Sequence, residues 1–230
     1  MLKRFWNYFS TFEKMLWLVS FIAVVSSFLI FDRENWLNLV ASVIGVTFLI
    51  FLAKGNPIGQ FLTIVFSILY AIISYSFAYY GEMITYLGMT APMALLALIA
   101  WLRHPFQGNK AEVEVNSISK KEVVFMFGLT AVVTAIFYFI LSALGNANIV
   151  PSTISVTTSF LASYLTFRRN HYYALAYAAN DLVLVVLWTL ATLTNIHYMP
   201  VLVNFIVFAF NDFYGFINWN RMKKKQALSA

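Results

Sequence analysis

Most of this chain consists of apolar segments, each near the length of about 20 residues that an α-helix needs to cross a lipid bilayer. Only 10% of the residues are charged, whereas a soluble domain carries about 25%. Backbone polar groups inside a bilayer must be satisfied within the protein, which a helix achieves along its own length. The sequence therefore predicts an all-α integral membrane protein.

Eight transmembrane helices are expected. They cover approximately residues 15–31, 36–53, 57–79, 83–103, 120–145, 151–168, 172–194 and 198–219. Ser10 with Glu13, and Ser119 with Glu122, have the spacing of capping boxes that open the first and fifth spans. Pro92 predicts a kink within the fourth span.

Basic residues are strongly segregated between the two sides of these spans. Of the 15 Lys and Arg residues, all except Arg33 fall on the side of the N-terminus. Cytoplasmic loops of membrane proteins carry an excess of Lys and Arg. Both termini are therefore expected in the cytoplasm, and the net charge of +6 reports topology rather than nucleic-acid binding.

The seventh and eighth spans carry polar residues at matching places. One helical face of the seventh holds Tyr173, Tyr177, Asn180, Leu184 and Trp188, and one face of the eighth holds Asn204, Phe208, Asn211, Gly215 and Trp219. Asp181 and Asp212 lie at the edges of these two faces. A carboxylate near mid-bilayer costs about 2.5 kcal/mol or more, so it normally faces a bundle interior or a wet cavity. Polar residues can also simply tie helices together, but the interleaved aromatic rings favour a substrate site.

A weak internal repeat relates spans two to four to spans six to eight. Residues 54–56 (KGN) resemble residues 169–171 (RNH), and residues 100–103 (AWLR) resemble residues 218–221 (NWNR). Small-solute transporters commonly place their site between such repeats. The third span would then contribute Gln60, Thr63 and Tyr70 from its polar stripe, although its Ser and Thr side chains can also bond back to helix carbonyls.

Several chemistries lack the residues that they require. There is no phosphate-binding G-x-x-x-x-G-K-[ST] loop, no H-E-x-x-H or other metal spacing, and no cysteine. Asp181 and Asp212 could form an intramembrane aspartyl dyad, but the glycine motifs that usually accompany one are absent. We expect no enzyme activity, no cofactor and no metal.

The segments that carry these polar residues resemble the PnuC family of vitamin transporters over residues 36–221. The matching pieces are residues 155–159 (SVTTS), 168–170 (RRN), Asn180 with Trp188, 211–215 (NDFYG) and 218–219 (NW). The resemblance implies a 3+1+3 helix core like that of SWEET sugar transporters, preceded by one extra helix. The expected units are residues 1–35 (interfacial segment and extra helix), 36–104 (first three-helix repeat), 105–149 (cytoplasmic loop and linker helix), 150–221 (second repeat) and 222–230 (basic cytoplasmic tail).

The resemblance also implies a function and a location. PnuC transporters import nicotinamide riboside across the bacterial inner membrane by facilitated diffusion, and a cytosolic riboside kinase traps the product for NAD biosynthesis. Alternating access is the implied mechanism, and a homotrimer is a candidate assembly. The partners are the riboside and the lipid bilayer, with no nucleic acid. Thiamine, riboflavin or a deoxynucleoside remain alternative substrates, while a sugar carrier would need fewer aromatic residues.

The chemistry of nicotinamide riboside suits the residues already singled out. Aromatic faces attract its cationic ring, and Asn or Gln side chains match its carboxamide and ribose hydroxyls. The expected substrate-binding residues are Gln60, Thr63, Phe66, Tyr70, Tyr177, Asn180, Asp181, Trp188, Asn204, Phe208, Asn211 and Asp212. No Lys or Arg lies on these faces, which disfavours a phosphorylated substrate.

Overall fold

The structure, a computed structural model, describes residues 7–76, 79–146 and 148–229. Its long helices are α2 (Thr11–Phe31), α3 (Trp36–Ala53), α4 (Pro57–Ser76), α6 (Ala91–Arg103), α7 (Lys120–Ala143), α8 (Ile149–Phe167), α9 (Tyr173–Thr194) and α10 (Met199–Leu228). Shorter elements are α5 (Tyr80–Thr85), the π-helical turn η1 (Tyr86–Thr90), the 3-10 turn η2 (Ile196–Tyr198) and a hairpin of β1 (Pro105–Phe106) and β2 (Asn109–Val113). The predicted all-α class is confirmed. Part of the predicted interfacial segment, residues 1–6, lies outside the described residues.

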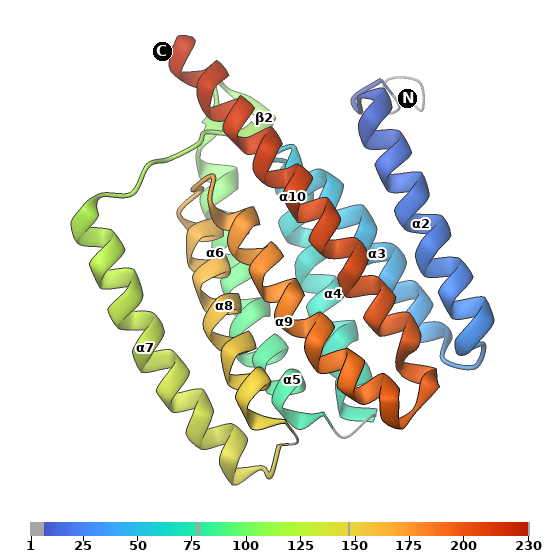
Figure 1. The fold of residues 1–230 in the computed structure, drawn as a ribbon. Helices are drawn as coiled ribbons and strands as arrows, with labels where there is room; N and C mark the ends of the chain where they lie inside the picture. The colour runs from blue at the N-terminus through green and yellow to red at the C-terminus, as the bar shows by residue number, and fades with distance from the viewer. Residues whose placement is uncertain (1–6, 77–78, 147, 230) are drawn as a thin grey trace.

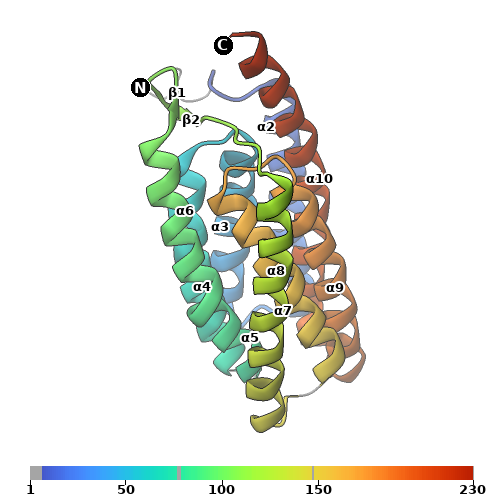
Figure 2. The same cartoon turned by 90° about the vertical axis from the view of Figure 1, so that its left-hand side faces the viewer.

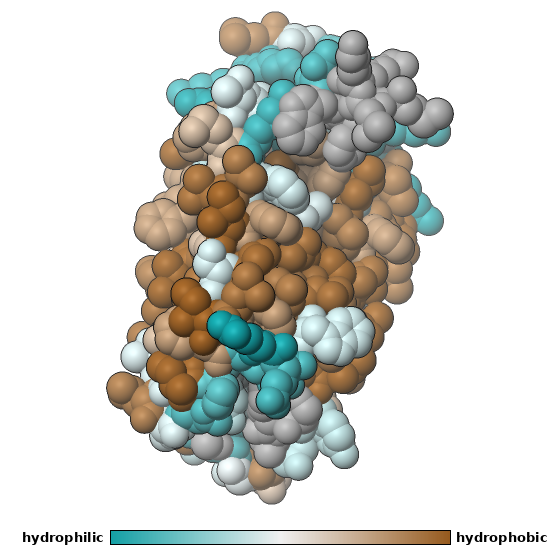
Figure 3. Space-filling model, turned by 90° about the vertical axis from the view of Figure 1, so that its right-hand side faces the viewer, coloured by the Kyte–Doolittle hydropathy of each residue, from teal (hydrophilic) through white to brown (hydrophobic). Residues whose placement is uncertain are grey.

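Within the described residues, seven helical stretches are long and apolar enough to cross a membrane. They are α2, α3, α4, α5 to α6 taken together, α7, α9, and η2 with α10. The helix α8 is not among them, because serine and threonine recur along its 19 residues. The outer surface agrees with a membrane location: Figure 3 shows a broad apolar belt between more polar ends on the face that carries α2.

Six helices pack into a closed ring in the order α3, α4, α6, α8, α9 and α10, and α10 returns to α3. The helix α7 lies outside this ring against α8, and α2 lies outside it against α3 and α10 (Figures 1 and 2). The start of α2 and the end of α10 lie at the same end of the bundle, here called the terminal end (Figure 1). The other end is called the opposite end.

The capping box at the start of α2 is confirmed. The Ser10 amide donates to the Glu13 carboxylate at 2.6 Å, and the Glu13 amide donates to Ser10 Oγ at 3.2 Å. The buried Glu13 carboxylate also pairs with Lys54 Nζ at 3.2 Å and accepts a hydrogen bond from the Tyr214 hydroxyl at 2.9 Å. These contacts tie the start of α2 to the end of α3 and to α10.

The predicted capping box of Ser119 and Glu122 forms one of its two expected hydrogen bonds, and the prediction of the other is wrong. The Glu122 amide donates to Ser119 Oγ at 3.2 Å, as expected. The Glu122 carboxylate does not return to the Ser119 amide, because it pairs with the Arg168 guanidinium and accepts from the Tyr164 hydroxyl. The carboxylate therefore joins α7 to α8 instead of closing the cap.

The predicted ends of the eighth and third spans differ from those of the helices α10 and α4. The α10 helix does not end at Trp219 but continues to Leu228, so most of the predicted basic tail is helical. Its last turns dock on the hairpin, because the Gln226 side chain donates to the Val113 carbonyl at 3.0 Å and accepts from the Val115 amide at 2.8 Å. The α4 helix ends at Ser76 rather than at Tyr79.

The fourth predicted span is interrupted by the π turn η1, which directly precedes the turn that holds Pro92. Proline has no amide hydrogen to donate within a helix, and π turns are a recognised way for a helix to absorb such an irregularity. The π turn shifts the direction of the side chains before Pro92 relative to a regular helix. This shift decides which residues of this span reach the centre of the ring.

The turns that follow α3 and α8 are built in the same way. The second residue of each has a positive φ, 65° at Gly55 and 56° at Arg169. The next residue, Asn56 or Asn170, donates its amide to a carbonyl in the last turn of the preceding helix at 2.9 Å in both cases. The predicted repeat is thus out of register by one residue here, because residues 54–56 match 168–170 rather than 169–171.

Two tryptophans at the terminal end make matching hydrogen bonds. The Trp101 indole donates to the Thr166 carbonyl at the end of α8 at 2.9 Å. The Trp219 indole donates to the Leu52 carbonyl at the end of α3 at 2.8 Å. The Trp101 indole therefore fastens α6 to α8, and the Trp219 indole fastens α10 to α3.

Candidate functional site

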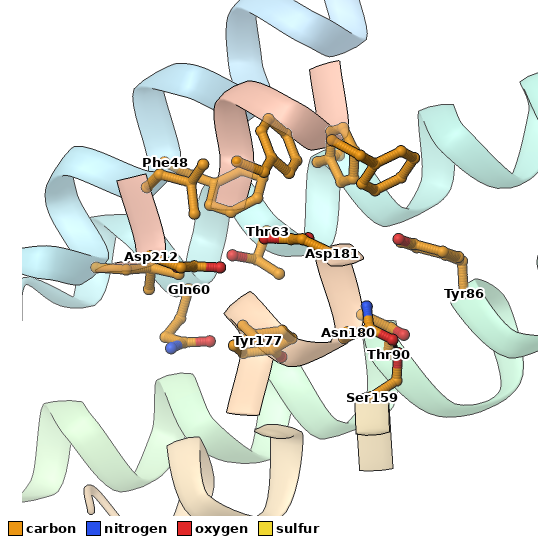
Figure 4. A pocket seen from close by; sticks show the side chains of 15 residues that line it. Phe48, Gln60, Thr63, Tyr86, Thr90, Ser159, Tyr177, Asn180, Asp181 and Asp212 are labelled. Atoms are coloured by element: carbon orange, nitrogen blue, oxygen red, sulfur yellow. Dashed lines mark hydrogen bonds between the residues drawn. The ribbon is translucent and has the colours of Figure 1, made fainter. Parts of the chain in front are cut away.

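A cavity lies at the centre of the ring and receives side chains from α3, α4, α8, α9 and α10 and from the η1 turn that precedes α6 (Figure 4). Its lining comprises Phe48, Leu49 and Leu52 from α3, Gln60, Thr63 and Phe66 from α4, Tyr86 and Thr90 from η1, Ser159 from α8, Tyr177, Asn180 and Asp181 from α9, and Phe205, Phe208 and Asp212 from α10. The free space is about 40 Å³, enough for roughly three water molecules. A larger ligand requires the surrounding side chains to move.

Two aspartates from neighbouring helices meet in this cavity. The Asp181 carboxyl on α9 and the Asp212 carboxyl on α10 both line the cavity and interact with each other there. Both side chains are almost completely buried, with exposed fractions of 3% and 5%. Two carboxylates buried in one site repel each other, which favours one shared proton on the pair over two negative charges.

Asn180 is oriented by hydroxyl groups on the adjacent helix α8. Its side-chain oxygen accepts hydrogen bonds from Thr158 at 2.8 Å, from Ser159 at 3.0 Å and from Ser155 at 3.4 Å. With the oxygen occupied, the NH2 group is left to donate on the cavity side (Figure 4). The serine and threonine segment of α8 thus sets the direction of a donor that lines the cavity.

Two other polar groups at the cavity wall have hydrogen-bonding capacity to spare. Among the described residues, Gln60 Nε2 and Asp181 Oδ2 have no hydrogen-bond partner, although both atoms are buried. Gln60 is 2% exposed and lies across the cavity from α9 (Figure 4). A buried polar atom without a partner is costly, so these two atoms indicate that a polar ligand completes the site.

Aromatic rings form the wall between α3, α4 and α10. The ring centroid of Phe48 lies 5.3 Å from that of Phe66 and 5.7 Å from that of Phe208. Gly45 lies directly beside Phe208, and a Cβ atom at this position would overlap the Phe208 ring. The wall provides flat apolar surfaces for an aromatic ligand.

Aromatic clusters close both ends of the cavity. At the terminal end, Tyr173 lies 4.8 Å from Trp219 and 6.4 Å from Trp101 between ring centroids, and it contacts the cavity residue Tyr177 at 6.2 Å. We call Trp101, Tyr173 and Trp219 the terminal cluster. At the opposite end, Trp188 lies 6.3 Å from Tyr70, 5.1 Å from Tyr79 and 5.9 Å from Tyr198. We call these four residues the opposite cluster.

Eight of the predicted site residues line the cavity, and four do not. Gln60, Thr63, Phe66, Tyr177, Asn180, Asp181, Phe208 and Asp212 are at its wall. Tyr70 and Trp188 belong to the opposite cluster, so Trp188 is separated from the cavity by a layer of rings and cannot stack on a ligand there in this arrangement. Asn204 is buried on α10 but is not part of the lining.

Asn211 faces away from the cavity. Its NH2 group donates to Ser20 Oγ on α2 and to the Val207 carbonyl on its own helix, both at 2.9 Å. Asn211 therefore does not line the cavity with its neighbour Asp212, because α10 is packed against α2 on one side and α9 on the other. Asn211 instead joins α10 to α2 through its hydrogen bond to Ser20.

Several lining residues could not be found from the sequence. Tyr86 and Thr90 reach the cavity from the π turn, whose altered direction no regular helical period describes. Phe48, Leu49, Leu52 and Phe205 are ordinary apolar residues of membrane spans. Ser159 could have been found, since it ends the serine and threonine segment that resembles the PnuC family.

Comparison with known proteins decides the family. The model of a family described as "Nicotinamide mononucleotide transporter" matches residues 35–221, most of the chain. The chain belongs to this transporter family. The resemblance to PnuC proteins is confirmed, and the chain is a membrane transporter rather than an enzyme.

Individual members of the family match over nearly the whole chain. The nicotinamide riboside transporter PnuC of Neisseria mucosa is 25% identical over 226 residues, 96% of this chain and 84% of the relative. The PnuC of Haemophilus influenzae is 20% identical over 213 residues, 92% of this chain and 91% of the relative. A crystal structure of the vitamin B3 transporter PnuC superimposes with a TM-score of 0.82 and 25% identity, covering 95% of this chain and 94% of that one.

Proposed function

We propose that this chain imports nicotinamide riboside across the bacterial inner membrane by facilitated diffusion. The observation that carries the proposal is the central cavity, where unpartnered polar atoms of Gln60 and Asp181 face aromatic walls. The Gln60 amide and the Asn180 NH2 group can bond the carboxamide and ribose hydroxyls of the substrate. The rings of Phe66 and Phe208 provide faces for its cationic pyridinium ring.

The charges of the cavity favour the riboside over the mononucleotide named in the family description. None of the described residues that line the cavity is Lys, Arg or His, whereas two are aspartates. A buried phosphate group needs basic partners, and a neighbouring carboxylate would repel it. The acidic lining also supports trapping of the imported riboside in the cell. Phosphorylation by a cytosolic riboside kinase would produce a mononucleotide, which the cavity would not bind.

The proposed membrane arrangement has eight spans and cytoplasmic termini. Although α8 is less apolar than the others, it packs between α6, α7 and α9, which shield its hydroxyl groups from lipid. The distribution of Lys and Arg then favours the terminal end as the cytoplasmic one.

We propose that α3, α4 and α5–α6 form one triplet and α8 to α10 the other, with α7 as linker, in the manner of a 3+1+3 core. The matching turns and the matching indole bonds of Trp101 and Trp219 support this assignment. The homotrimer stays a prediction, since the structure describes a single chain.

Alternating access would use the two aromatic clusters as gates. With both clusters packed, the cavity is closed at each end and too small for the riboside. Opening the terminal cluster would expose the cavity to the cytoplasm, and opening the opposite cluster would expose it to the other side. The π turn between α5 and α6 is a candidate hinge, because π turns occur frequently at functional sites.

Transport in proteoliposomes tests the proposal. Nicotinamide riboside is expected to enter without ATP or an ion gradient, and to stop when the internal and external concentrations are equal. Nicotinamide mononucleotide is expected to compete at least about 10-fold less well, since it requires a phosphate in an acidic cavity. Thiamine, riboflavin and deoxynucleosides serve as competitors. Stronger competition by one of these, or accumulation driven by an imposed proton gradient, would contradict the proposal.

A substitution at Asn211 tests the assignment of this residue to the helix contact rather than to the cavity. Asn211→Leu is expected to leave riboside affinity within about 3-fold of the unchanged protein and to lower stability by about 1 kcal/mol, the usual size of an interhelical hydrogen bond in a membrane. Titration calorimetry and a melting curve on the same purified sample measure the two effects. A large loss of affinity with unchanged melting would return Asn211 to the site.

A further inference from the structure

The acid pair of Asp181 and Asp212 lacks any compensating positive charge. No Lys, Arg or His is among the described residues that line the cavity. The titratable groups near the pair are the tyrosines Tyr86, Tyr173 and Tyr177, which are uncharged at neutral pH. The cavity therefore holds an acid pair surrounded by neutral and aromatic groups.

The charge of the pair follows from the burial of two carboxyl groups in one cavity. Repulsion between like charges disfavours ionisation of both groups, and one shared proton leaves a single negative charge on the pair. A buried charge without an ion partner is unfavourable. Asp181 Oδ2 is buried without a hydrogen-bond partner among the described residues, so it can accept one from a ligand.

A second, independent feature indicates that this partner is a ligand. Gln60 Nε2, on the other side of the cavity, is also buried and without a partner among the described residues. The rings of Phe66 and Phe208 line the same cavity, with their centroids 5.6 Å apart. The cavity thus combines a flat aromatic surface with one uncompensated negative charge.

We propose that Asp181 and Asp212 together act as the counter-ion that selects a flat aromatic cation over a neutral compound of the same shape. This inference rests on the proposed function, since nicotinamide riboside carries a fixed positive charge on its ring. On binding, that charge compensates the pair, while a neutral ring of equal size leaves the carboxylate unpaired. The two residues are thereby determinants of specificity, and neither needs to change its protonation.

The reduced 1,4-dihydro form of nicotinamide riboside provides the test, because it keeps the ribose and the carboxamide but has no ring charge. Binding of both forms to the purified full-length chain is measured by titration calorimetry. The unchanged protein is expected to bind the cationic form at least about 10-fold more tightly, as a single charge interaction in a buried site predicts.

Asparagine variants separate the shared charge from the individual residues. Asp181→Asn and Asp212→Asn each leave one carboxylate beside an amide donor, so each single variant keeps one negative charge and should retain the preference within about 3-fold. The double variant has no charge and should bind the two forms about equally. Asp32→Asn is the matched control, because Asp32 is a buried carboxyl at the end of α2, bonded to Asn35 and Asn38 and outside the cavity. Melting curves verify that each variant is folded.

The outcomes distinguish this inference from the function on which it rests. If the unchanged protein binds both forms equally, or if a folded double variant keeps the preference, the counter-ion role is wrong while riboside transport stands. If a single variant loses the preference, the charge is not shared between the two carboxyls and the inference also fails. If the unchanged protein binds neither form, the proposed function is itself wrong and the counter-ion role falls with it.

Discussion

Replacing Asn180 with leucine is expected to weaken nicotinamide riboside binding by about 10- to 100-fold. Asn180 is the lining residue whose orientation is best determined, since Thr158 and Ser159 both donate to its oxygen within 3.0 Å. Leucine has a similar size but no NH2 donor. A polar group of the bound riboside would then be buried without a partner, which accounts for the size of the loss.

The change is expected to act on binding more than on folding. After the substitution the α8 hydroxyls can bond to helix carbonyls, as Thr158 already does to the Ile154 carbonyl at 3.0 Å. Asn220→Leu is a suitable control, because the Asn220 side chain lies outside the cavity lining and donates to the Phe216 carbonyl on its own helix at 2.8 Å. Titration calorimetry on both variants measures the effect. Equal affinities for the two would show that Asn180 does not contact the substrate.

Truncation of Trp219 to alanine is expected to lower the free energy of unfolding by about 3–5 kcal/mol. Trp219 is completely buried and its ring lies 5.4 Å from that of Trp101 and 4.8 Å from that of Tyr173. Alanine would leave a cavity in the terminal cluster and would also leave the Leu52 carbonyl without its indole donor. Both effects weaken the contact between α10 and α3.

A variant series separates packing from hydrogen bonding at this position. Trp219→Phe keeps an aromatic ring but loses the bond to Leu52, so its stability is expected to lie between those of the unchanged protein and the alanine variant. Trp36→Ala is the control, because Trp36 is 67% exposed at the start of α3. Denaturant titration in mixed micelles measures the unfolding free energies. A loss at Trp219 no larger than that at Trp36 would contradict a structural role for the terminal cluster.

Much of the helical framework could be predicted from the sequence because its ends carry local signals. The bounds of α3 are as predicted, since Trp36 and Lys54 flank an unbroken apolar run. The Ser10–Glu13 capping box at the start of α2 depends only on neighbouring residues and was found for that reason. The Glu122 carboxylate was misassigned because a tertiary partner, Arg168, competes with the local cap.

The site residues could be predicted where all polar residues on one face of a helix point to the cavity. Asn180 and Asp181 lie on α9, and both reach the cavity. On α10 the polar face is shared between two neighbours, so Asp212 turns to the cavity and Asn211 to α2. Helical periodicity gives the faces of a helix but not the helices that they meet.

Trp188 shows a related limit of the sequence. Its depth within the span distinguished it from tryptophans at the membrane interface, and it is indeed buried, with an exposed fraction of 1%. Depth alone could not reveal that Tyr70 and Phe66 lie between it and the cavity. The substitution Trp188→Ala therefore addresses the closure of the opposite end rather than substrate contact.

Nicotinamide riboside is expected to bind in the cavity enclosed by the six-helix ring. An experimental structure of the full chain with the riboside bound is the most direct measurement of where it binds. The expected result is density for the pyridinium ring against Phe66 and Phe208, with its polar groups within hydrogen-bonding distance of Gln60 and Asn180 and its charge beside Asp181. Density for the riboside outside this lining, as in the surface hollow at the opposite end between Asp32 and His197, would contradict the claim.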